Sequence, residues 1–101
     1  MTILSEPVEF EWDSGNRDKN LLKHGITNKE IEEAFEQRGK IIVEDEKHSL
    51  SERRYMMWSK TADEKMVMII CTVRKKYIRV ISARRMNKKE RNFYDQKTEK
   101  I

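Results

Sequence analysis

The feature that most restricts the fold of this 101-residue chain is a nearly uninterrupted apolar run, Met66–Val73, with the sequence MVMIICTV. A run of this length without polar alternation is typical of a strand that is buried on both faces. Because a buried strand needs hydrogen-bonding neighbours, the run predicts a sheet with this strand at its centre. The basic residues 74–76 follow, and we expect them to turn the chain back into an antiparallel hairpin.

The second strand of this hairpin, Tyr77–Ala83, is interrupted by Arg79 and followed by two further arginines. Its β-branched and aromatic residues suit a half-buried sheet surface. Guanidinium groups held on a rigid strand suit phosphate binding, because their planar fork binds pairs of oxygen atoms. An edge strand with solvated charges is the other interpretation of the same pattern. Regular alternation predicts two faces: Tyr77, Arg79, Ile81 and Arg85 on one, and Ile78, Val80, Ser82 and Arg84 on the other.

The charge of the chain is divided unevenly between its two halves. Residues 1–52 carry 13 acidic and 7 basic side chains, whereas residues 53–101 carry 15 basic and 5 acidic ones. The segment from Arg74 to Arg91 alone holds nine basic residues and one acid, Glu90. Such a concentration predicts a polyanionic partner, nucleic acid first and an acidic protein second.

The N-terminal part predicts a short strand and a helix. Apolar residues alternate in Val8–Trp12, which indicates a strand. Asp13 and Ser14 are good N-cap residues for a helix over about Asn16–His24. Gly25 is well placed to end that helix.

The middle of the chain predicts a second helix and two more strands. The segment Thr27–Glu30 has the form of a capping box, and we expect the helix that it opens to end at Gly39. Lys40–Glu44 and Arg53–Lys60 are typical of strands. In the second of these strands, alternation places Arg54, Met56 and Trp58 on one face and Tyr55, Met57 and Ser59 on the other.

A last helix is predicted after Asn87, which forms a second capping box with Glu90, and the tail from about Gln96 is expected to fray. The resulting order is one strand, two helices, four strands and one helix. Strands grouped together with helices on either side along the chain predict a single α+β domain with a mainly antiparallel sheet.

Several classes of protein do not fit the sequence. The single cysteine, Cys71, has no internal disulfide partner, which fits a reducing cytoplasm. No signal peptide or membrane-spanning run is recognisable. Asp45, Glu46 and His48 can be drawn as a metal site, but the chain lacks a Cys/His cluster and a glycine-rich phosphate loop. We therefore expect no metal and no cofactor.

Three ordered motifs make the chain resemble the BrnT toxins of type II toxin–antitoxin pairs, over about residues 9–95. The motifs are Phe10-Glu11-Trp12-Asp13, Asn20 with Lys23-His24-Gly25, and Ile78–Arg85. The resemblance implies a RelE-like ribonuclease fold, cleavage of RNA that arrests translation, and neutralisation by a BrnA-type antitoxin. It also implies that DNA is bound only through the complex with that antitoxin.

RNA cleavage without a metal needs groups that hold the phosphate and groups that move protons. We predict that Lys23 or His24 carries a proton, although both also suit the last turn of a helix, where cations interact well with its dipole. Tyr94 is predicted to stack on a base or assist a proton transfer, or else to pack its helix on the sheet. The remaining catalytic candidates are Arg54, Arg79 and Arg84. The predicted RNA-binding residues are Arg85, Arg74, Lys75, Lys76, Lys88 and Lys89.

Three functions remain open on the sequence. The first is a ribonuclease toxin with an antitoxin partner. The second is a non-catalytic RNA-binding or co-repressor subunit with the same fold. The third is a basic scaffold whose ligand is an acidic protein.

Overall fold

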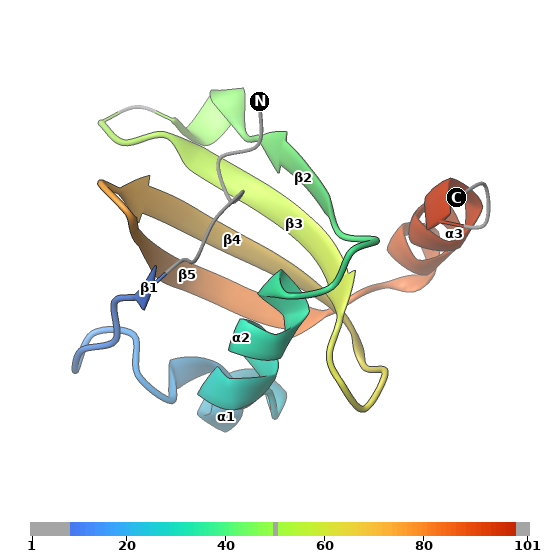
Figure 1. Cartoon of the computed structure of the whole chain (residues 1–101), viewed down its shortest axis with the longest axis horizontal. Coiled ribbons are helices and arrows are strands. Elements are labelled where there is room, and N and C mark those ends of the chain that lie inside the picture. The colour runs from blue at the N-terminus through green and yellow to red at the C-terminus, as the bar shows by residue number, and fades with distance from the viewer. Residues whose placement is uncertain (1–8, 50, 99–101) are drawn as a thin grey trace.

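The computed structural model describes residues 9–49 and 51–98 (Figure 1). Five strands form one sheet in the order β1-β5-β4-β3-β2. Strands β2 to β5 pair antiparallel, whereas β1 runs parallel to β5. The strands are β1 (Glu9–Phe10), β2 (Ile41–Glu44), β3 (Arg54–Lys60), β4 (Met66–Arg74) and β5 (Tyr77–Arg85). The helices are α1 (Lys19–His24), α2 (Asn28–Phe35), the short 3₁₀ turn η1 (Glu46–His48) and α3 (Lys88–Thr98). The predicted α+β class and element order are confirmed.

The hydrophobic core lies between α2 and the face of the sheet that is turned to the viewer in Figure 1. Helix α2 contributes Ile31, Ala34 and Phe35, which are buried against residues of β3, β4 and β5. The Ser59 hydroxyl donates to the Ala34 carbonyl oxygen at 2.7 Å, which ties α2 to β3. The sheet residues of this core and its border are Phe10, Ile42, Tyr55, Met57, Val67, Ile69, Cys71, Val73, Ile78, Val80 and Ala83.

The apolar run Met66–Val73 is the middle strand of the sheet, as predicted, and it supplies several of these buried residues. Burial raises the pKa of the Cys71 thiol to about 12. The thiol therefore stays protonated at neutral pH, as expected for an inert core cysteine.

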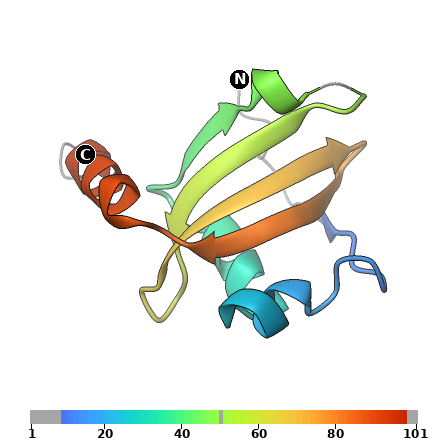
Figure 2. The ribbon, with the colours of Figure 1, turned by 180° about the vertical axis from the view of Figure 1, so that it is seen from behind.

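No described helix crosses strands β2–β5 on the other side of the sheet, seen in Figure 2, and we call this side the open face. Side chains of β3 and β4 that do not point into the core lie here, including Arg54, Trp58 and Thr72. The predicted division of β3 into two faces is confirmed.

The predicted division of β5 is only half right, because a β-bulge interrupts it. Cys71 pairs with Val80, and the preceding residue of β4, Ile70, pairs with Ser82, so Ile81 has no partner of its own. An extra residue in one strand reverses the alternation beyond it. Ala83 therefore joins the core, and Ser82 and Arg84 lie on the open face with Arg79. The prediction that placed Arg85 on the face of Arg79 is wrong for the same reason.

The first helix begins at Lys19, three residues later than predicted, and Asp13 and Ser14 do not cap it. Asn16 is buried instead, and its side-chain amide donates to the Glu11 and Val80 carbonyl oxygens at 2.9 and 3.3 Å. Residues 14–18 form turns on the Asp13 carbonyl oxygen in place of the predicted start of the helix. Gly25, at φ 69°, ends the helix as expected. Of the first predicted strand, the structure has Glu9–Phe10, and Val8 lies outside the described residues.

Both predicted capping boxes are confirmed, at Thr27 with Glu30 and at Asn87 with Glu90. Helix α2 ends at Phe35 rather than near Gly39. In its last turn the N–H groups of Glu36 and Gln37 donate to carbonyl oxygens three residues earlier, and the Ala34 carbonyl oxygen also accepts from Ser59. Helix α3 continues to Thr98, past the predicted start of the frayed tail. No described helix is long and apolar enough to span a membrane.

Candidate nucleic-acid site

Arginines from three strands meet on the open face near the β4–β5 turn. Thr72 pairs with Arg54 on one side and with Arg79 on the other, so the three residues form one row across β3, β4 and β5. With strands about 4.8 Å apart, the Cα atoms of the two arginines are about 10 Å apart. Arg74 lies two residues along β4 on the same face. We call Arg54, Arg74 and Arg79 the arginine cluster.

Carboxylates from two other segments bind this cluster. Asp13 accepts from both terminal nitrogens of Arg79, at 2.7 and 3.2 Å. Glu52 accepts from Nε and Nη2 of Arg74, at 2.6 and 2.9 Å. Glu11 bridges Arg74 and Arg79, at 3.3 Å from each. Arg54 makes no ion pair with any residue that the structure describes.

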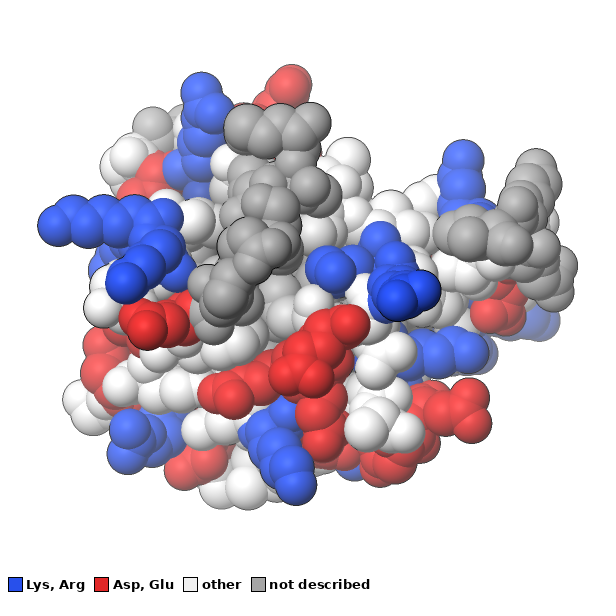
Figure 3. Space-filling model, in the orientation of Figure 1, with Lys and Arg blue, Asp and Glu red and all other residues white. Residues whose placement is uncertain are grey.

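These pairs keep the acids ionised and leave the cluster electrically balanced. The hydrogen bonds from Arg79 lower the pKa of Asp13, and those from Arg74 lower the pKa of Glu52. Three guanidinium groups thus face three carboxylates, counting Glu11. An anion that binds here must compete with these acids. Lys75 and Lys76, exposed on the adjoining turn, add positive charge. Figure 3 shows basic side chains at its left, where the β4–β5 turn lies in Figure 1.

Helix α1 lies along the outer edge of β5, beyond the short strand β1. The Lys19 ammonium donates to the Ile81 carbonyl oxygen at 2.5 Å, and the Asn20 side-chain oxygen accepts from the Ala83 N–H at 3.0 Å. Asn16 likewise donates to the Val80 carbonyl oxygen. These three side chains bind the backbone groups on the outer edge of β5 that a further strand would otherwise pair with.

The predicted proton carriers Lys23 and His24 lie in the last turn of α1. Both are exposed, and neither makes a hydrogen bond or ion pair with any residue that the structure describes. The structure therefore places them on the helix next to β5 but does not join them to the arginine cluster.

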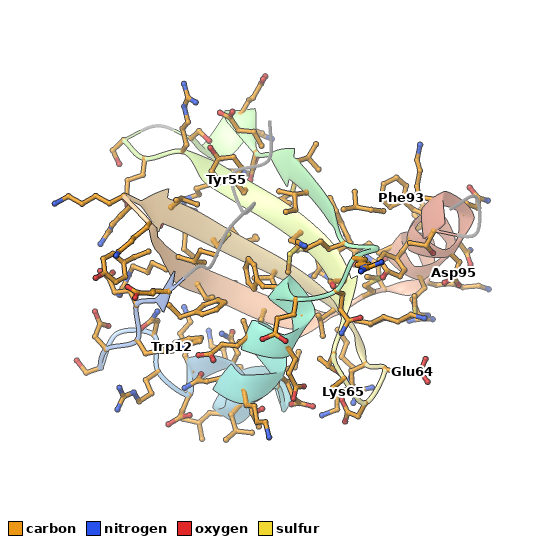
Figure 4. All side chains as sticks on the ribbon, viewed as in Figure 1. Trp12, Tyr55, Glu64, Lys65, Phe93 and Asp95 are labelled. Carbon is orange, nitrogen blue, oxygen red and sulfur yellow. The ribbon has the colours of Figure 1, made fainter. Side chains whose placement is uncertain are left out.

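A second polar cluster lies at the far end of the open face. Arg84 binds both oxygens of Glu90, at 2.7 and 3.1 Å, and the Trp58 indole N–H donates to the same carboxylate at 3.2 Å. The rings of Trp58 and Phe93 meet edge to face at 5.6 Å. An open cavity of about 310 Å³ lies here, lined by Trp58, Lys89, Glu90 and Phe93. Figure 4 shows Phe93 at this end of the sheet and Trp12 at the other.

Arg84 is thus separated from the arginine cluster. It lies five residues beyond Arg79 on β5, which corresponds to about 16 Å of strand. Tyr94 is buried in α3, and its hydroxyl lies 3.7 Å from the position that a Cβ atom would take at Gly39. Burial raises the pKa of Tyr94. The structure does not bring Arg84 or Tyr94 together with Arg79, and their catalytic roles stay predictions.

The other predicted RNA-binding residues are exposed but divided between places. Lys75 and Lys76 are beside the arginine cluster, whereas Lys88 and Lys89 begin α3. Arg85 is exposed at the end of β5.

The Arg84–Glu90 pair leads to a prediction about stability. Hydrogen bonds from Arg84, above all, lower the pKa of Glu90 in the folded protein. The ion pair therefore contributes its full stabilisation at pH values above the ordinary pKa of a glutamate. This stabilisation is lost as the pH falls through the lowered pKa of Glu90 in the folded protein. Glu90→Gln should cost about 1 kcal/mol at pH 7, because Arg84 is partly exposed, and nearly nothing near pH 2. Urea unfolding at both pH values tests this, with the exposed Glu36→Gln as control. Equal losses at both values would contradict it.

The three acids that bind the arginine cluster were missed in the sequence. Asp13 was predicted as a helix cap, and Glu11 and Glu52 were given no role. Glu11 and Asp13 lie within the first motif, and the signal was their position two residues apart at the end of an expected strand. Nothing in the sequence places that segment beside Arg79, because their contact depends on the parallel pairing of β1 with β5.

The fold and the cluster define a small α+β domain that presents arginines from neighbouring strands on a sheet face that no described helix crosses. A family model described as the ribonuclease toxin BrnT of type II toxin–antitoxin systems matches residues 12–90. The chain therefore belongs to the BrnT ribonuclease toxin family. No curated protein matches it.

Proposed function

We propose that the protein is a metal-independent endoribonuclease toxin that arrests translation and is neutralised by a BrnA-type antitoxin. The arginine cluster carries this proposal, because Arg54 and Arg79 flank one position on a rigid sheet. A phosphodiester held there meets guanidinium groups from two strands. They supply the positive charge that the reaction needs as negative charge grows on the phosphate oxygens.

In the proposed reaction the 2′-oxygen of the substrate attacks the adjacent phosphorus. A bond forms between the 2′-oxygen and phosphorus, and the bond from phosphorus to the 5′-oxygen of the next nucleotide breaks. One group accepts the proton of the 2′-hydroxyl, and another gives a proton to the departing 5′-oxygen. The products are a 2′,3′-cyclic phosphate and a 5′-hydroxyl. Lys23 or His24 is the proposed proton carrier, and its side chain would reach the 2′-oxygen or the 5′-oxygen of the phosphodiester that the arginines hold.

Substrate binding would exchange one anion for another at Arg79. The side chain of Asp13 is 53% exposed, and ion pairs this open to water contribute little to stability. A phosphate group can therefore take the place of Asp13 at small cost. Lys75 and Lys76 would bind neighbouring phosphates, and Arg84 and Arg85 with Lys88 and Lys89 would bind more distant ones.

The test is incubation of the purified protein with RNA in excess EDTA. We expect cleavage to persist and the products to carry 2′,3′-cyclic phosphate and 5′-hydroxyl ends, which mass spectrometry distinguishes. A variant with Lys23→Ala and His24→Ala should cleave at least about tenfold more slowly, since a positioned acid or base contributes 10²–10⁴-fold. Cleavage that stops in EDTA and returns with Mg²⁺ would contradict the metal-independent mechanism.

The same assay separates the other two functions. RNA binding without cleavage would favour a non-catalytic RNA-binding or co-repressor subunit, an alternative that the balanced charge of the arginine cluster supports. Failure to bind RNA even at low salt would favour a scaffold for an acidic protein, since phosphate contacts strengthen as salt falls.

A further inference from the structure

Thr72 occupies the centre of the row that joins the two flanking arginines. It lies on β4 between Arg54 on β3 and Arg79 on β5, with its side chain on the open face. Residue pairs directly opposite each other in a sheet have Cβ atoms about 4.5–5.5 Å apart. The hydroxyl of Thr72 is thus at the floor of the arginine cluster, with a long cationic side chain on each side.

This hydroxyl has no hydrogen-bond partner among the described residues, although Thr72 is only 1% exposed. Folded proteins rarely leave a buried polar atom unpaired, because its bonds to water are lost without replacement. Valine has nearly the same shape and suits a strand equally well, and its methyl group needs no partner. Packing alone therefore does not explain a hydroxyl at this position.

We propose that Thr72 is a substrate-binding residue whose Oγ1 donates a hydrogen bond to a non-bridging oxygen of the scissile phosphodiester. The inference rests on the proposed function and adds a residue to it. Arg79 now binds Asp13 and Glu11. When a phosphate draws Arg79 away from these acids, the floor of the cluster opens and the hydroxyl gains an acceptor. Two guanidinium groups and one hydroxyl then surround a single phosphate.

The key variant is Thr72→Val, which removes the hydroxyl and keeps the volume. We expect its RNA cleavage to fall about 10- to 100-fold, below the loss for a charged donor, because one donor to the growing negative charge is missing. Thr72→Ser, which keeps the hydroxyl, should retain most of the activity. Thr98→Val makes the same change on α3 and should cleave like the wild type.

The melting temperature distinguishes this role from a structural one. If the hydroxyl is unpaired in the free protein, Thr72→Val melts at the same temperature as the wild type or higher. A fall of several degrees would show that the hydroxyl is already satisfied within the fold, and would overturn the proposal.

Binding of a fully 2′-O-methylated oligoribonucleotide, followed by fluorescence anisotropy, keeps this test independent of the proposed function. Thr72→Val should bind this uncleavable RNA at least threefold more weakly than the wild type and Thr72→Ser. A loss in cleavage or in binding at unchanged melting temperature supports the proposal. If the wild type binds the methylated RNA but does not cleave unmodified RNA, the nuclease proposal alone is refuted. Unchanged cleavage and binding in Thr72→Val, or no binding by the wild type, overturns the role of Thr72.

Discussion

Replacing Arg79 by alanine is expected to lower kcat/KM for RNA cleavage about 10²- to 10³-fold, the effect of removing one charged donor from a site where charge develops. Arg79 is the best placed of the cluster for this role, because it is 22% exposed and is held by two acids on a rigid strand. Its alanine variant leaves Glu11 and Asp13 without this partner, but both are open to water. The fold should therefore survive, and circular dichroism with thermal melting checks that it does.

Two further variants sharpen the measurement. Arg79→Lys keeps the charge and loses the planar fork, so it should restore only part of the activity. Arg38→Ala removes an exposed arginine of the α2–β2 connection and should leave cleavage unchanged. If Arg79→Ala folds and cleaves as fast as Arg38→Ala, the arginine cluster is not the site of the reaction.

Asp13 should affect how RNA binding depends on salt, because its carboxylate competes with phosphate for Arg79. A phosphate that displaces Asp13 from Arg79 forms one ion pair by breaking another, so this contact adds little to the salt slope of RNA binding. Asp13→Asn removes the competing charge while keeping the side-chain shape. In the proposed function, the balance between its carboxylate and the phosphate, rather than the number of basic residues alone, would set the affinity of the free protein for RNA.

The fold was predictable where local signals and burial agree. The apolar run Met66–Val73 fixed the centre of the sheet, and the capping boxes at Thr27 and Asn87 fixed two helix starts. The predicted start of the first helix was wrong, because the side chain of Asn16 binds the backbone of β5, 64 residues away along the chain. A local cap signal such as Asp13 cannot compete with a buried bond of this kind.

The site was predictable in composition and not in arrangement. The sequence indicated that arginines of the third, fourth and fifth strands bind phosphate, and the register brings Arg54, Arg74 and Arg79 together. The sequence did not indicate that Arg84 lies away from the arginine cluster, at the opposite end of the open face. Arg84 and Arg79 share a charge and a strand, but five residues of extended chain hold them apart. The bulge at Ile81 was also invisible, since an extra residue in one strand is defined only by its partner strand.

The residues around Asn20 have a structural role that the sequence did not indicate: they bind the outer edge of β5. Strand β5 has β1 beside it only at its first two residues, Tyr77 and Ile78. Beyond that point its outer edge would present free N–H and C=O groups, which invite pairing with another chain. Asn16, Lys19 and Asn20 bind these groups instead. The first motifs of the chain thus protect the strand that carries Arg79.

Replacing Asn20 by alanine should consequently lower the free energy of unfolding by about 2 kcal/mol, since the buried Ala83 N–H loses its acceptor. The gain from removing the unpaired Nδ2 of Asn20 offsets only part of this loss. Urea unfolding measures it, with Leu22→Ala as control, because Leu22 on the same helix is 87% exposed and should contribute about 0.5 kcal/mol or less. The Asn20 variant should also self-associate, because a free edge of β5 can pair with a second copy. If Asn20→Ala is as stable and as monomeric as Leu22→Ala, then α1 does not protect this edge, and the position of Lys23 and His24 beside β5 has another cause.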